Sequence, residues 1–171
     1  MVGNILVMIK QKTIYFTMIY SKIEYGLPVY GMTSQENILK IQTMQSKLLK
    51  ILTNKPIRYS TNQLHNDLNI LKVKDIVNQE ILLFVHNFMN NKLPDVFARY
   101  YTHRKDIQTI QTRNIENKLV IPMVRTDFGA SSLKVVGPKL WNQIPNAMQN
   151  FDNIKSLRDS WRKSILPYPI N

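Results

Sequence analysis

The chain has 171 residues, of which 44% are apolar, so it can form one domain, or one domain with a small appendage, around a hydrophobic core. Lys and Arg number 23 against 11 Asp and Glu, and the net charge of +12 predicts binding to a polyanion, either nucleic acid or an anionic membrane surface. The alternative is that the charge only keeps the protein soluble. The absence of cysteine excludes disulfides and zinc sites with cysteine ligands, and it is compatible with an intracellular protein.

The N-terminal segment predicts a long amphipathic helix over about residues 4–25. Tyr15, Ile19 and Ile23 recur every four residues and form one apolar face. We expect Gly26 to end this helix, because glycine accepts the left-handed conformation of helix C-termini, and Leu27-Pro28 to form a stiff extended corner. Charged residues interrupt the apolar start after nine residues, whereas a membrane-spanning helix needs about 20, so we expect no insertion into a membrane and name no membrane as a partner. A basic peripheral membrane protein that uses its N-terminal helix is a further alternative.

A second helix is predicted over about residues 34–53, with an apolar stripe and a row of lysines beside it. The stripe consists of Ile38, Ile41, Met44, Leu48 and Leu52. Lys40, Lys47 and Lys50 fall together on a neighbouring face, and Lys55 and Arg58 follow on either side of Pro56. This row can track a phosphate backbone, or it can be an ordinary solvated helix face; the sequence leaves both interpretations open.

Further helices are predicted over residues 61–68, 73–91 and 153–165. Three long helices with short connections are typical of a helical bundle. The histidines at 65, 86 and 103 lack partners at metal-ligand spacing, so we interpret them as surface or half-buried side chains and expect no metal site.

Residues 106–137 predict a small element that contains β-strands. Leu119–Ile121 is a β-type run that Pro122 ends, and Ser132–Val136 is a second candidate strand after a turn. Pro138 is expected at the first position of a short helix over residues 139–143. Trp141 on that helix is either a buried plug or a platform on which a base stacks.

Several motifs, in this order, carry a resemblance to a known family. They are YSKIEYGLPVYG at residues 20–31, TRN at 112–114, IPMVRTDFG at 121–129 and VGPKLWNQIP at 136–145. With the linking LNILKVKDI at 68–76, they resemble the thumb and the segment after the palm in reverse transcriptases of jockey-like non-LTR retrotransposons. The resemblance covers nearly the whole chain.

The resemblance implies a fragment or remnant of an RNA-directed DNA polymerase that lacks the catalytic palm. Its thumb would hold an RNA/DNA template-primer duplex without sequence preference, against the missing palm domain or another protein, and its place of action would be the nucleus. We therefore predict a mainly α fold: a three-helix, thumb-like bundle over residues 1–105, then a small α+β element over residues 106–171 that ends in a C-terminal helix.

We expect the chain alone not to be an enzyme. Polymerases hold two metal ions with clustered carboxylates, and here no two acidic residues are adjacent or one apart. We therefore name no catalytic residue, no metal ligand and no cofactor. The candidate nucleic-acid-binding residues are Lys40, Lys47, Lys50, Lys55, Arg58, Arg113 and Arg125, the last two because they lie in the motifs of the resemblance. The alternative is a stand-alone helical protein-interaction domain with no nucleic-acid role.

Overall fold

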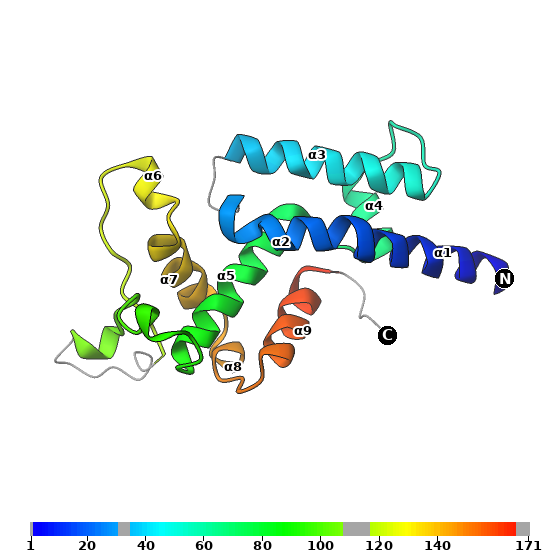
Figure 1. The fold of residues 1–171 in the computed structure, drawn as a ribbon. Coiled ribbons are helices and arrows are strands. Elements are labelled where there is room, and N and C mark those ends of the chain that lie inside the picture. Colours follow the sequence, from blue (N-terminus) through cyan, green and yellow to red (C-terminus); the bar gives the residue numbers. More distant parts are fainter. Residues whose placement is uncertain (1, 31–34, 108–116, 167–171) are drawn as a thin grey trace. The chain divides into compact units, whose positions relative to one another are not determined.

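The structure is a computed structural model that describes residues 2–30, 35–107 and 117–166 (Figure 1). The described residues fall into two compact units, one within Met1–Val77 and Lys163–Asn171 and the other within Asn78–Arg162. The predicted boundary between residues 105 and 106 lies inside the second unit. The longer helices are α1 (Val2–Ile14), α2 (Ser21–Tyr30), α3 (Gln35–Leu52), α4 (Thr61–Leu68), α5 (Val73–Met89), α7 (Leu133–Gln143) and α9 (Ile154–Ile165). The shorter ones are α6 (Asp127–Ala130), α8 (Asn146–Gln149), and the 3-10 turns Asp95–Phe97 and Arg104–Asp106.

The first long helix continues through the predicted corner. A π-helix at Tyr15–Tyr20 joins α1 to α2 without a break, and α2 ends only at Tyr30 (Figure 1). The prediction that Gly26 ends the helix is therefore wrong. Pro28 removes one backbone hydrogen bond but lies in the last turn, where a single lost bond does not break a helix that neighbours support.

The core of the first unit buries a polar side-chain network between α3, α4 and the first helix. Gln45 is 1% exposed, and its Nε2 donates to the Tyr15 hydroxyl at 2.7 Å and to the Leu71 carbonyl at 3.0 Å. Gln42 accepts the backbone N–H of Val73 at 2.7 Å and therefore satisfies a donor at the start of α5. The network fixes how α3 lies against its neighbours, because each buried polar group needs its partner.

The buried face of α3 differs from the predicted stripe. Ile38, Gln45, Ser46 and Leu49 are buried, whereas Met44 and Leu48, both assigned to the stripe, are exposed. The sequence pattern counted amides and hydroxyls as outward-facing. Here their hydrogen bonds allow them to be buried, and the buried face of the helix is rotated accordingly.

Three helices end on an asparagine in the left-handed conformation: Asn54 after α3, Asn69 after α4 and Asn91 after α5, with φ of 51°, 53° and 52°. At Asn54 the N–H of Lys55 bonds to the Lys50 carbonyl at 2.9 Å and the N–H of Asn54 to the Ile51 carbonyl at 3.2 Å. This pair of bonds is the Schellman motif, and it satisfies carbonyls that the helix end would leave free.

The predicted β-containing element is wrong: the described residues include no strand, only an isolated bridge between His103 and Leu119. One side of Leu119 faces the chain at residues 102–104. On its other side the Asn142 side chain accepts the N–H of Leu119 at 3.0 Å and donates to its carbonyl at 2.8 Å. A side chain therefore occupies the edge where a second strand would pair.

The second candidate strand, Ser132–Val136, is also helical, because α7 begins at Leu133 and runs through Pro138. The helix that was expected to start at Pro138 begins earlier, at Leu133.

Gly137 lies where α7 comes very close to the side chain of Tyr101. A Cβ on it would lie 2.3 Å from Oη of Tyr101, and the same hydroxyl donates to the Leu133 carbonyl at 3.1 Å.

The core of the second unit surrounds Trp141, which is 0% exposed. Its indole Nε1 donates to the Asn117 carbonyl at 2.7 Å, so the ring and its polar atom are both buried with a partner. Trp141 is thus a plug, and the alternative of a base-stacking platform is wrong.

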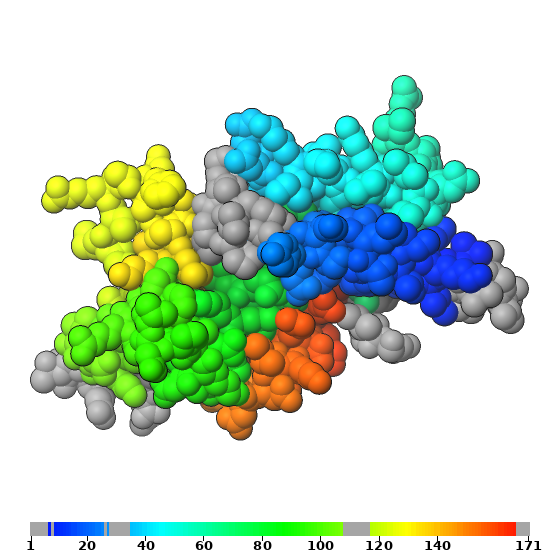
Figure 2. Space-filling view, viewed as in Figure 1, coloured from blue at the N-terminus to red at the C-terminus, as the bar shows by residue number. Residues whose placement is uncertain are grey.

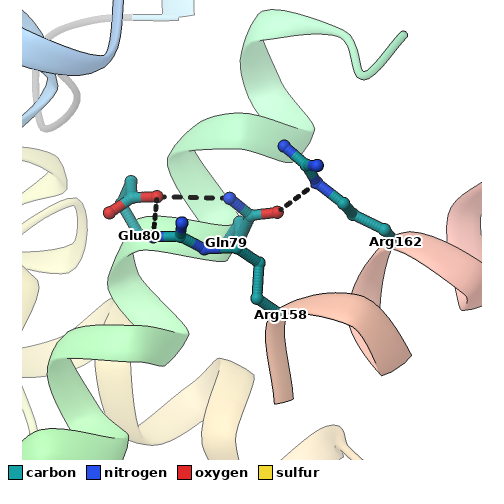
Figure 3. Close-up of polar contacts among 4 residues, drawn as sticks. All are labelled: Gln79, Glu80, Arg158 and Arg162. Atoms are coloured by element: carbon teal, nitrogen blue, oxygen red, sulfur yellow. Dashed lines mark hydrogen bonds and ion pairs between the residues drawn. The ribbon is translucent and has the colours of Figure 1, made fainter. Parts of the chain in front are cut away.

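Within the same unit, polar contacts link α5 and α9 (Figure 3). Oε1 of Gln79 accepts from Nε of Arg162 at 3.2 Å, and Arg158 lies 3.9 Å from Glu80. These two arginines therefore contact protein groups of α5.

Candidate nucleic-acid interface

Four of the five candidate residues of the first unit lie in the C-terminal half of α3 and in the loop that follows it. We call Lys47, Lys50, Lys55 and Arg58 the basic cluster. Figure 2 shows the end of α3 and this loop, in cyan to teal, exposed at the surface. The left-handed Asn54 reverses the chain after α3, so that the loop lies beside the last helical turn.

Side-chain contacts hold the loop in place. Nζ of Lys50 donates to the Ile57 carbonyl at 2.7 Å, and Nζ of Lys55 lies 4.8 Å from the centre of the Tyr59 ring. The Tyr59 hydroxyl in turn donates to Oδ2 of Asp67 at 2.6 Å. This hydrogen bond to a carboxylate is the main reason that the pKa of Tyr59 is raised. The loop therefore presents its cations from a fixed backbone.

Lys47 and Arg58 are exposed, whereas Lys50 is half-buried. Lys40 is also exposed but forms an ion pair with Glu36 at 2.9 Å, one turn earlier on α3. That carboxylate offsets the charge of Lys40, so we leave Lys40 out of the basic cluster. An exposed pair of this kind contributes little to stability.

The first unit has a large excess of basic over acidic side chains. Its sequence holds 11 basic against 4 acidic side chains, whereas the second unit holds 12 against 7. Residues 35–60 contain the basic cluster and Lys40 but only one acidic residue, Glu36. This surface can attract a polyanion through charge, and it offers no carboxylate cluster for chemistry.

The two arginines named from the motifs lie elsewhere. Arg113 falls in residues 108–116, outside the described residues. Arg125 is exposed in the second unit, between Val124 and Thr126, and is not part of the basic cluster.

The sequence prediction missed Tyr59, whose ring contacts Lys55 and whose hydroxyl contacts Asp67. The four-residue spacing from Lys55 to Tyr59 was a weak signal, because no helix was predicted there. It also missed the burial of His65, which is 1% exposed and donates through Nδ1 to the Ile70 carbonyl at 3.0 Å.

Within residues 2–30, 35–107 and 117–166, no group of three or more His, Asp or Glu side chains is placed to hold a metal ion. In the same part of the chain, no helix has the length and apolar character needed to cross a membrane. Comparisons with protein families, with curated proteins and with solved structures return no match.

Proposed function

We propose that this chain binds nucleic acid through the basic cluster, by contacts to the phosphate backbone and without sequence preference. The observation that carries the proposal is that Lys47 and Lys50 near the end of α3 are followed by Lys55 and Arg58 on a loop whose backbone is held by Asn54, Lys50 and Tyr59. Lysine and arginine contacts to phosphates provide affinity in the same way for every sequence.

The proposed biological role is that of the thumb and post-palm segment of a non-LTR retrotransposon reverse transcriptase. The motifs quoted above support this role. A thumb has to accept every template, which agrees with binding through charge. In this role the catalytic carboxylates would come from a palm domain acting as partner.

A pair of charge-neutralising variants tests the binding surface. Lys47→Gln with Arg58→Gln removes two exposed cations of the cluster but leaves Lys50 and Lys55, whose side chains hold the loop. The matched control is Lys139→Gln with Lys155→Gln, which changes the net charge equally at exposed positions of the second unit. Circular dichroism and thermal melting show whether each variant keeps its fold.

The measured quantity is the affinity for a fluorescent DNA duplex as a function of salt. Each phosphate contact contributes about −0.9 to the slope of log affinity against log salt. We expect the cluster variant to lose about two units of slope, whereas the control loses less than one. Equal losses in the two variants would show that only net charge matters, and the proposed surface would then be wrong.

A further inference from the structure

Helix α3 carries a second apolar stripe on its outward side. Ile41, Met44, Leu48 and Ile51 follow one another at spacings of three, four and three residues. This is the a/d pattern with which one helix packs against another. Met44 is 62% exposed, Leu48 39% and Ile51 74%, and Ile41 at the edge is half-buried. We call these four residues the outer stripe; Figure 2 shows α3, in cyan, at the surface of the molecule.

The outer stripe has lysines along one edge only. Lys40 and Lys47 each precede an a-position residue, which places them at the g positions that select a partner helix by charge. The opposite, e-position edge is formed by Gln45, which is bound to Tyr15 and Leu71, and by the half-buried Leu52. A helix packed on the stripe would therefore face the charge of Lys47 on one side, next to the Lys40–Glu36 pair, and the unit's own surface on the other.

A second copy of the chain does not fit this surface. In an antiparallel pair the g positions face each other, so Lys40 and Lys47 would meet lysines. In a parallel pair Lys40 would face Gln45 and Lys47 would face Leu52, and neither offers a negative charge.

We propose that the outer stripe of α3 docks a short amphipathic helix of another protein, with acidic residues that face Lys40 and Lys47. The apolar face of that helix would cover Met44, Leu48 and Ile51. Its carboxylates would complement the lysines, which gives specificity more than affinity. Because Glu36 pairs with Lys40 in the free protein, the partner would compete for Lys40 but meet Lys47 directly. This inference does not depend on the proposed nucleic-acid function.

Two synthetic 21-residue helical peptides test the proposal. Both have leucine at the a and d positions; one has glutamate at e and g, and the other has lysine there. Each is labelled and titrated with the full chain at low salt, and binding is followed by fluorescence anisotropy. We expect the glutamate peptide to bind at least about tenfold more tightly than the lysine peptide, because like charges across such an interface disfavour a partner.

Three variants separate the outer stripe from the rest of the surface. Met44→Gln with Ile51→Gln should weaken binding of the glutamate peptide at least about tenfold, since the apolar contact is lost. Leu39→Gln is the control, because Leu39 is 62% exposed on the same helix but lies off the stripe. Lys47→Glu should shift the preference toward the lysine peptide. The Met44/Ile51 variant keeps every basic side chain, so it should keep the affinity for duplex DNA.

Four results would overturn the proposal. The first is that neither peptide binds, and the second is that both bind equally well. The third is a dimer in sedimentation equilibrium that Met44→Gln with Ile51→Gln dissociates, which would assign the stripe to a second copy. The fourth is binding to phosphatidylserine vesicles that depends on Met44 and Ile51 without any binding of the glutamate peptide, which would assign the stripe to a lipid surface.

Discussion

Nε2 of Gln42 lies 3.1 Å from Nε2 of His65, and this contact selects the neutral form of the imidazole. Oε1 of Gln42 accepts the N–H of Val73, so its Nε2 can only donate toward His65. Nδ1 of His65 donates to the Ile70 carbonyl, so its Nε2 has to accept. Protonation would place two donors against each other. Burial, which disfavours the charged ring, is the largest cause of the lowered pKa of His65.

The first prediction is that the free energy of unfolding falls as the pH drops through the range below about 6.5, the ordinary pKa of histidine. The folded state holds His65 neutral below that pH, while the unfolded chain binds the proton. The unfolded state then carries more protons, so stability rises with pH and is lost toward acid. Urea unfolding of the wild type at pH 7.5 and pH 5.5 measures the difference.

His65→Gln is the control for that experiment, because glutamine does not titrate. The pKa of His103 is also lowered, mainly by burial, and it adds a pH dependence of the same sign in both proteins. We expect a smaller loss of stability between the two pH values in the variant than in the wild type. Equal losses in the two proteins would contradict the assigned role of His65.

The second prediction concerns Gly137 in α7. Alanine has the higher helix propensity, by about 1 kcal/mol, yet we expect Gly137→Ala to destabilise the protein by about 1–3 kcal/mol. The reason is that the new Cβ would lie 2.3 Å from Oη of Tyr101 and 3.1 Å from Cγ2 of Val85. Combining Gly137→Ala with Tyr101→Phe should cost less than the sum of the single changes, as a double-mutant cycle in urea would show. Full additivity would mean that this close approach does not matter.

The third prediction concerns Asn142, whose side chain forms hydrogen bonds with both the N–H and the carbonyl of Leu119. Asn142→Asp keeps the acceptor for the Leu119 N–H but replaces the donor to the Leu119 carbonyl with a negative oxygen. We expect a loss of about 1–3 kcal/mol in thermal or urea unfolding, because a buried carbonyl loses its partner. Gln143→Asp introduces the same charge at the next, exposed position and should change stability by less than about 0.5 kcal/mol. A similar effect of the two substitutions would show that these two hydrogen bonds contribute nothing to the free energy of unfolding.

Local signals in the sequence predicted the positions of most helices. The prediction for residues 61–68 matches α4. The helix predicted over residues 34–53 is one residue longer than α3 at each end, and the helix predicted over residues 153–165 begins one residue before α9. These ends depend on short-range features, such as the asparagine that follows α3. The apolar periodicity of α9 is likewise contained in the helix itself.

Long-range partners explain what the sequence could not predict. Leu119 looks like a strand residue, but its backbone is satisfied by Asn142, which lies 23 residues away. The buried face of α3 depends on Gln45 reaching Tyr15, 30 residues earlier. Neither pairing leaves a trace in local periodicity, so both the β-element and the apolar stripe were misassigned.

The candidate site also has features that local spacing predicts and features that depend on the folded conformation. The lysines of α3 could be grouped from helical spacing, because Lys47 and Lys50 lie on one helix. The contact of Lys50 with the Ile57 carbonyl and the position of Lys55 over Tyr59 could not be predicted, because they depend on the loop conformation after Asn54. The ion pair between Glu36 and Lys40 had a local signal in its four-residue spacing, which the sequence interpretation did not use.

The central claim is that the basic cluster binds nucleic acid through phosphates, and the salt dependence of wild-type binding tests it most directly. Two labelled 20-base-pair DNA duplexes of unrelated sequence are titrated at a series of salt concentrations. With four cations engaged, we predict a slope of about −3 to −4 for log affinity against log salt, and the same affinity for both duplexes. An affinity that does not change with salt, or no binding at low salt, would contradict the claim.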